Sequence, residues 1–351
     1  MNCTLDIARS QQCLCALLLL LTRLRISLAT NHQLLVISLD GFRFDYSQLA
    51  HTPVLDRLRN RGATFDYMHP VFPTKTFPGH HSMATGLHPD SHGIVGNYMF
   101  DASTGKHFSP RRMNDALWWR EGEPIWITAK RQGLKTGVCF WLGGQMEFGG
   151  LRADLVMPFN HSVSKHEQIN TVATWLTRDR ADLVLLYFNE PDHTAHSTGS
   201  ASTSQETRDA VQHVDRLIGQ LMRKLANAGL RDQLNILIVS DHGMTDVSLD
   251  DRVIELHDVI SHHDVRDVTD EGALVNLLPH EGREDAVYEQ LKQLQFRRPH
   301  MTVYKKQDLP EHLLFKTHPR IHPIVILADE SWMVVWVSTE SSNRKRKCDH
   351  L

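Results

Sequence analysis

The sequence predicts an α/β fold with a doubly wound, mainly parallel sheet sandwiched between helices, and with a small inserted subregion. Several short apolar runs are nearly continuous in hydrophobic residues, which is typical of strands buried on both faces. Helical patterns with one apolar face lie between these runs, and such alternation favours this fold class. The chain has 351 residues, 41% hydrophobic and 23% charged, as expected for a globular protein with one large core or two modest ones.

The expected strands are 34–39, 137–142, 183–188, 235–240 and 323–328. One expected helix covers 52–62, with Val54, Leu55 and Leu58 on one face and an end at Gly62. A second covers 206–229, and its predicted apolar face is Val211, Val214, Leu217, Ile218, Leu221 and Leu225. The mixed pattern of about 253–320 predicts the insertion, and the polar, basic residues 338–351 predict a solvated tail.

Residues 1–29 are expected to be a secretory signal peptide. The apolar run 13–21 is too short to cross a bilayer as a helix, and small residues that suit a cleavage site follow it at 27–29. A short buried helix is the alternative. The sequon at Asn160 agrees with an exported glycoprotein. We therefore expect a secreted or luminal protein, with membrane contact left open, and the net charge of -3 argues against a nucleic-acid surface.

Acidic residues follow four of the five expected strands. They are Asp40, the segment 189–192, the pair Asp241 and His242, and the pair Asp329 and Glu330. Functional groups gather beyond the carboxyl ends of parallel strands, so these side chains are expected to meet. Asp192 and His196 would share one face of a helical turn that starts after Pro191. Carboxylate and imidazole ligands without thiolates suit zinc in an open site, whereas a structural role is the alternative for any single pair.

Thr76 opens the helical stretch "TFPGHHSMATG". Pro78 is tolerated in the first turn, and the free N–H groups of a helix start favour a phosphate. A threonine hydroxyl becomes a nucleophile when a metal lowers its pKa. An ordinary N-cap is the alternative for Thr76. Because acids are expected nearby, the pattern favours attack on phosphorus.

Five motifs occur in a known order: "LDGFR", "PTKTFPGHHSMATGLHPDSHGIVGN", "EPDHTAH", "SDHGM" and "ADESW". The chain resembles the ectonucleotide pyrophosphatase/phosphodiesterase family of the alkaline phosphatase superfamily from about residue 34 to 332. The resemblance implies an alkaline-phosphatase-like fold, a catalytic domain over 30–337 and two bound Zn²⁺. It implies that one zinc is held by Asp40, Thr76, Asp241 and His242, and the second by Asp192 and His196.

The resemblance also implies chemical roles. Thr76 would form a phosphothreonine intermediate, and Asn97 would steady a phosphate oxygen. The family supplies a further histidine to the second zinc, and His350 is the candidate here, with a frayed terminus as the alternative. Because the family's C-terminal segment is missing, we expect a truncated member that holds its second zinc weakly.

Two aromatic residues suggest the substrate. Phe77 directly follows the expected nucleophile, and the resemblance implies that Phe159, where the family often has a tyrosine, stacks on the base. Phe159 would equally suit the core, and Tyr187 is expected to line the pocket. A nucleotide pyrophosphatase/phosphodiesterase is therefore the first hypothesis. The alternative substrate is a choline phosphodiester, a lysophospholipid or glycerophosphocholine, in an aromatic cage that includes Trp118 and Trp119. A weakly active or inactive family member is the third hypothesis.

Overall fold

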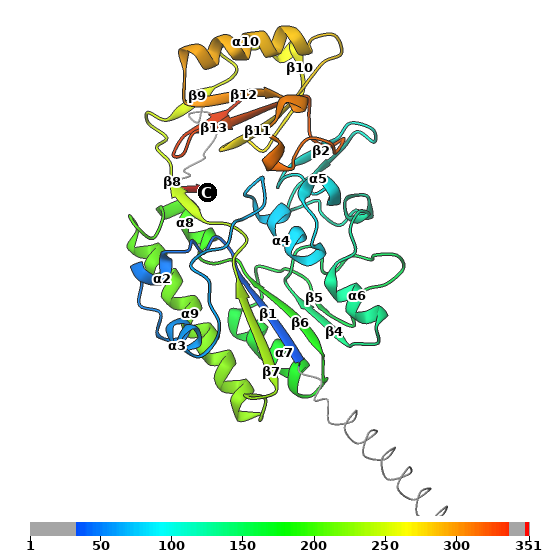
Figure 1. Ribbon diagram of the computed structural model, residues 1–351, viewed down its shortest axis with the longest axis vertical. Helices are drawn as coiled ribbons and strands as arrows, with labels where there is room; N and C mark the ends of the chain where they lie inside the picture. Colours follow the sequence, from blue (N-terminus) through cyan, green and yellow to red (C-terminus); the bar gives the residue numbers. More distant parts are fainter. Residues whose placement is uncertain (1–32, 337–347, 351) are drawn as a thin grey trace, which may run out of the picture.

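The main sheet has five parallel strands in the order β5-β4-β6-β1-β7 (Figure 1). The computed structural model describes residues 33–336 and 348–350. The strands of this sheet are β1 (Gln33–Leu39), β4 (Thr136–Cys139), β5 (Leu155–Met157), β6 (Leu183–Phe188) and β7 (Leu234–Val239). Each neighbouring pair runs parallel, so all carboxyl ends point to the same edge. The predicted parallel sheet is therefore confirmed.

Burial differs between the centre and the edge of this sheet. Every side chain of β6 is buried, as the continuous apolar run predicts. β7, in contrast, pairs only with β1 among the described strands, and its Leu237 is 49% exposed. The prediction that residues 235–240 are buried on both faces is thus wrong. Hydrophobic periodicity reports apolar content, and it does not tell a central strand from an edge strand.

Helices cover both faces of the main sheet (Figure 1). They are α2 (Tyr46–Leu49), α3 (Pro53–Arg61), α4 (Thr76–Thr85), α5 (Pro89–His92), α6 (Ile125–Arg131), α7 (Lys165–Thr177), α8 (Asp192–Thr198) and α9 (Gln205–Asn227), with a 3₁₀ turn at Ala116–Trp119. α7 packs against α9 and against β6, whereas α6 packs against β4. The two predicted helices correspond to α3 and α9, and all six residues of the predicted α9 face are buried.

A second layer is antiparallel, with the strand order β10-β11-β13-β12. Its elements are β10 (Val265–Thr269), β11 (Leu274–Pro279), α10 (Glu284–Arg297), β12 (Met301–Lys305) and β13 (Ile324–Ala328), with 3₁₀ turns at His262–Asp264, Lys306–Asp308 and Glu311–Leu313. Residues 323–328 were expected in the parallel sheet, and this expectation is wrong. Ile324 and Ile326 join the core with α10, whereas Val325 joins the main core, so the strand is buried on both faces here too.

The second layer continues beyond the expected insertion of 253–320. β14 (Met333–Val335) pairs with β9 (Val253–Glu255), and β13 also lies after residue 320. Two short pairs complete the described structure: β2 (Met99–Asp101) with β3 (Lys106–Phe108), and β8 (Met244–Asp246) with β15 (Cys348–His350). The expected signal peptide, and residues 338–347 and 351 of the expected tail, lie outside the described residues. Within the described part of the chain, no helix is long and apolar enough to cross a bilayer.

Candidate metal centre

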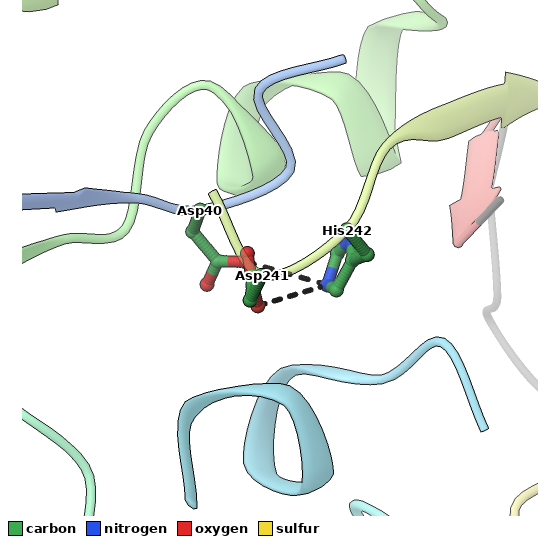
Figure 2. A group of neighbouring side chains, drawn as sticks. All are labelled: Asp40, Asp241 and His242. Carbon is green, nitrogen blue, oxygen red and sulfur yellow. Dashed lines mark ion pairs between the residues drawn. The ribbon is translucent and has the colours of Figure 1, made fainter. Parts of the chain in front are cut away.

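Two carboxylates and an imidazole meet at the carboxyl edge of the main sheet. Asp40 follows β1, and Asp241 and His242 follow the neighbouring strand β7. Ligand atoms of these three residues all lie within 4.8 Å of one another. Figure 2 shows the three side chains pointing toward one another. Each residue is at most 4% exposed. The expectation that acids at separate strand ends converge is met for this group.

The ring of His242 is oriented by the backbone of the next residue. Nδ1 lies 2.9 Å from the carbonyl oxygen of Gly243, and a carbonyl can only accept, so Nδ1 carries the proton in the neutral ring. Nε2 then presents a lone pair. It lies 3.4 Å from Asp40 Oδ1 and 3.2 Å from Asp241 Oδ2. Such fixing of the tautomer through the other ring nitrogen is usual for metal-binding histidines.

The oxygens that face Nε2 suit a cation. Asp40 Oδ1 and Asp241 Oδ2 are buried and have no hydrogen-bond partner among the described residues. Buried polar atoms are nearly always paired, and two carboxylates beside a lone pair repel one another without a positive charge. Carboxylate and imidazole donors are ligands that zinc and similar divalent ions prefer. The donor set therefore fits a divalent metal ion.

The pKa values of Asp40 and Asp241 reflect the burial and mutual repulsion of the carboxylates. Burial, followed by the charges of Asp241 and Asp192, raises the pKa of Asp40 well above its usual range. Burial also raises the pKa of Asp241 from 3.8 to about 7, and the charge of Asp192 adds to this rise. A metal ion would offset the same repulsion and keep both groups ionised at neutral pH.

Thr76 faces this group from the start of α4. It is the first residue of α4, and its Oγ1 lies 3.3 Å from His242 Nε2. Lys75 occupies the N-cap position and no side chain caps the helix, so the N-cap alternative for Thr76 is wrong. The close approach of α4 depends on Gly79, where a Cβ would come within 3.0 Å of Asp241 Cβ.

Two residues around the centre hold its ligands, and sequence reasoning missed the role of both. His80, one turn after Thr76, donates from Nδ1 to the carbonyl oxygen of Thr76 at 2.8 Å, so its Nε2 accepts from the hydroxyl of Ser38 at 2.8 Å. Its Nδ1 also lies 3.2 Å from Asp241 Oδ2. Tyr187 was expected to line the pocket, but its hydroxyl donates to Asp40 Oδ2 and its side chain is buried. The four-residue spacing from Thr76 to His80 was the available signal.

Asp192 and His196 lie beside the first group on α8. The helix begins at Asp192, directly after Pro191 as expected, and Asp192 Oδ1 lies 3.3 Å from His196 Nε2. The backbone N–H of Asp192 donates to the carbonyl of Asp40 at 3.1 Å, which ties the two pairs together. β15 runs beside α8, and the backbone of His350 is paired with Met244 of β8.

Asn97 lies next to the threonine. Its Oδ1 accepts from the backbone N–H of Phe77 at 2.9 Å, which leaves the amide nitrogen as the group that can donate. The Phe77 ring is buried and packs edge-on against Phe108 with a centroid distance of 5.1 Å. The contact that the structure gives Phe77 within the site is therefore through its backbone.

Phe159 lines a cavity of about 600 Å³. Its ring centroid is 6.2 Å from that of Tyr187, which contacts Asp40. Other residues that line the cavity include Met113, Asn114, Gln145, Met146, Arg152 and Pro158. The ring is only partly buried, so Phe159 is not simply a core residue.

Two further expectations are not met. Trp118 and Trp119 are each 1% exposed, and the Arg320 guanidinium lies over Trp118, 4.9 Å from its centroid, so this pair forms no open cage for a choline group. Asp329 and Glu330 follow β13 of the second layer. There Asp329 pairs with His300 and Glu330 accepts from Thr245, and neither belongs to the three-residue group around His242.

The fold and the site together define the class: an α/β protein with a candidate metal centre and a hydroxyl beside it. The chain matches the family of type I phosphodiesterases / nucleotide pyrophosphatases over residues 34–350. It is 38% identical to bis(5'-adenosyl)-triphosphatase ENPP4 of Homo sapiens over 306 residues, 86% of this chain and 66% of the relative. It is 37% identical to human ectonucleotide pyrophosphatase/phosphodiesterase family member 5, over 87% of this chain and 63% of that relative.

Comparison with solved structures finds a member of the same family. An inactive threonine-to-alanine variant of murine ectonucleotide pyrophosphatase/phosphodiesterase 5 in complex with AMP superposes with a TM-score of 0.85 at 34% identity, covering 91% of this chain and 83% of that one. The chain belongs to the type I phosphodiesterase / nucleotide pyrophosphatase family, which confirms the predicted family, the alkaline-phosphatase-like fold and the class of phosphodiester hydrolases. It spans about two thirds of the length of the curated relatives, 66% and 63% of the two named above.

Proposed function

We propose that the chain is a zinc-dependent nucleotide pyrophosphatase/phosphodiesterase in which Thr76 is the nucleophile. The observation that supports this most is the position of the Thr76 hydroxyl, 3.3 Å from His242 Nε2, beside buried carboxylate oxygens that have no hydrogen-bond partner among the described residues. A hydroxyl at this position can bind the same cation as the carboxylates and the imidazole of His242. It also stands at a helix start, where N–H groups favour a phosphate.

Asp40, Thr76, Asp241 and His242 would hold one ion. When bound, the ion would act as a Lewis acid that lowers the pKa of the hydroxyl and offsets charge on the phosphate. Thr76 Oγ gives its proton to water and attacks phosphorus, while the bond to the leaving oxygen breaks on the opposite side and that oxygen departs with its electron pair as the released phosphate or alcohol. Water then hydrolyses the phosphothreonine and restores the hydroxyl. The Asn97 amide would donate to a non-bridging oxygen on which charge develops.

A second ion would bind Asp192 and His196. We include His350 as a third ligand, because its backbone is paired with Met244, two residues after His242, and β15 runs beside α8. The metal content of the purified protein, measured by mass spectrometry, tests this. We expect two zinc ions for each wild-type chain and about one for His350→Ala. Two zinc ions in both proteins would exclude His350.

The substrate proposed is a nucleotide ester. One relative is named as a bis(5'-adenosyl)-triphosphatase, and a structural neighbour holds AMP. Phe159, partly exposed beside the cavity, is placed to stack on a base, and Phe77 remains a proposed substrate contact. No observation favours the choline alternative, since Trp118 and Trp119 are buried.

Replacing Thr76 tests the mechanism. Thr76→Ala should abolish hydrolysis of a 4-nitrophenyl nucleotide ester, whereas Thr76→Ser keeps a hydroxyl and should retain measurable turnover. Both variants should unfold at nearly the wild-type temperature, because only a small side chain at the site changes. Near-normal turnover by Thr76→Ala would refute the nucleophile.

Export to a secretory compartment is also proposed, and the exposed position of Asn160 suits a glycan there. Expression in a secretory host should yield a protein whose gel mobility increases after glycosidase treatment, and Asn160→Gln should remove that change. A wild-type chain with unchanged mobility would contradict glycosylation at this site.

A further inference from the structure

The segment that carries Asn97 is held by the second layer. Arg320 holds both ends of this segment: its Nη1 donates to the carbonyl of Gly93 at 2.8 Å, and its Nε donates to the carboxylate of Asp101 at 3.2 Å. Between these points, the backbone N–H of Tyr98 donates to Asp270 Oδ1 at 3.0 Å. The residue next to Asn97 is therefore anchored to the second sheet.

Asp270 makes a close contact with the backbone at Gly96. It follows β10, it is 4% exposed, and its φ of 57° is in the left-handed region. Asparagine and aspartate tolerate this region better than most residues. Its carboxylate lies so close to Gly96 that a Cβ at residue 96 would come within 1.7 Å of Asp270 Oδ2. Residues 96 and 98, which flank Asn97, thus both contact the same side chain.

Asn97 is in turn fixed to the backbone beside the nucleophile. Its Oδ1 accepts from Phe77 N–H at 2.9 Å, and Phe77 directly follows Thr76. The direction of its amide nitrogen depends on where the 96–98 backbone lies. A displacement of that backbone would move the donor away from the phosphate, and even a 1 Å misplacement of a reacting group is costly in rate.

We propose that Asp270 is a positioning residue, which from the second layer fixes the segment 96–98 and so aims Asn97 at the substrate's phosphate. The inference rests on the proposed function of Asn97. It gives the second layer a part in catalysis, because a carboxylate directly after β10 would set the position of a donor beside the metal centre at the main sheet.

The test compares two substitutions of Asp270. Asp270→Gly removes the carboxylate and keeps the backbone free to adopt the left-handed conformation, whereas Asp270→Asn retains an oxygen acceptor. For a 4-nitrophenyl nucleotide ester, we expect Asp270→Gly to lower kcat by about 10- to 100-fold with a smaller change in KM. Asp270→Asn should restore most of the loss. Asp267→Ala, which removes a carboxylate of β10 three residues before Asp270, is the matched control and should leave kcat unchanged.

A double-mutant cycle separates positioning from general destabilisation. If Asp270 acts through Asn97, Asp270→Gly should cost nothing further in an Asn97→Ala background. A wild-type kcat for Asp270→Gly, or losses that multiply in the double variant, would overturn the proposal.

A second readout does not depend on turnover. Hydrogen exchange of residues 93–99 should speed up in Asp270→Gly, and unchanged exchange would overturn the anchoring by itself. If Asn97→Ala hydrolyses the ester as fast as the wild type, the proposed role of Asn97 fails. Faster exchange in Asp270→Gly would then still support the anchoring of the segment, so the two failures are distinguishable.

Discussion

Replacing Asp241 by asparagine should change how the stability of the metal-free protein depends on pH. Burial raises the pKa of Asp241 from 3.8 to about 7 in the folded chain. Between these two pH values the folded state keeps a proton that the unfolded state has lost. The free energy of unfolding therefore falls as pH rises through this window, because the unfolded state binds fewer protons. Asparagine cannot titrate, so the variant should lack this loss.

The size of the effect follows from the shift. Three pKa units correspond to about 4 kcal/mol, of which about 2 to 3 kcal/mol are lost between pH 5 and pH 8. For a chain of this length that is about 4 °C in the unfolding temperature. The lowered pKa of His80 acts in the opposite direction and is common to the two proteins. The raised pKa of Asp40 acts in the same direction, and part of that rise comes from the charge of Asp241, so the variant loses this part as well. The difference between wild type and variant therefore measures Asp241 together with its effect on Asp40.

The assay is thermal unfolding by circular dichroism in excess chelator at pH 5 and pH 8. Relative to the wild type, Asp241→Asn should become more stable as pH rises. With zinc present the order should reverse at pH 8, because the variant lacks a ligand that the metal needs. An equal change with pH in both metal-free proteins would refute a buried, crowded carboxyl at residue 241.

Two further predictions concern other side chains. Burial lowers the pKa of His81 from 6.5 to about 4. Below pH 6.5 the unfolded state binds a proton that the folded state does not bind, so the free energy of unfolding falls as pH falls. Between pH 7 and pH 5 the free energy of unfolding falls by about 2 kcal/mol for this reason. Urea unfolding of His81→Gln should therefore show a free energy of unfolding that depends less on pH than in the wild type. The same dependence on pH in both proteins would contradict the prediction. Phe159→Ala should raise KM for a nitrophenyl nucleotide ester about tenfold or more and leave bis(4-nitrophenyl) phosphate unaffected. An equal rise for both esters would argue against stacking on the base.

The sequence predicted the parts of the centre that depend on local order along the chain. Asp192 and His196 share a helical turn because of their spacing, and Asp40 and Asp241 meet because strands β1 and β7 are neighbours with parallel direction. The family motifs added the assignment of ligands. Neither required knowledge of packing between layers.

What escaped prediction depends on that packing. Tyr187 donates to Asp40 only because β6 lies beside β1, and no spacing along the chain encodes this. β13 was assigned to the wrong sheet because an antiparallel strand covered on both faces has the same apolar run as a parallel one. Trp118 and Trp119 looked like a ligand cage, since the covering guanidinium of Arg320 comes from a distant segment.

Among the described strands, β7 pairs with β1 alone, and this edge of the sheet has a consequence for handling the protein at high concentration. The strand, Leu-Asn-Ile-Leu-Ile-Val, contains no charged residue and no proline. Charged residues and proline in edge strands usually prevent pairing with another chain. Backbone groups that β1 leaves unpaired can therefore template a second chain. We expect self-association that grows with concentration, and a lysine at the half-exposed Leu237 should suppress it in light-scattering measurements.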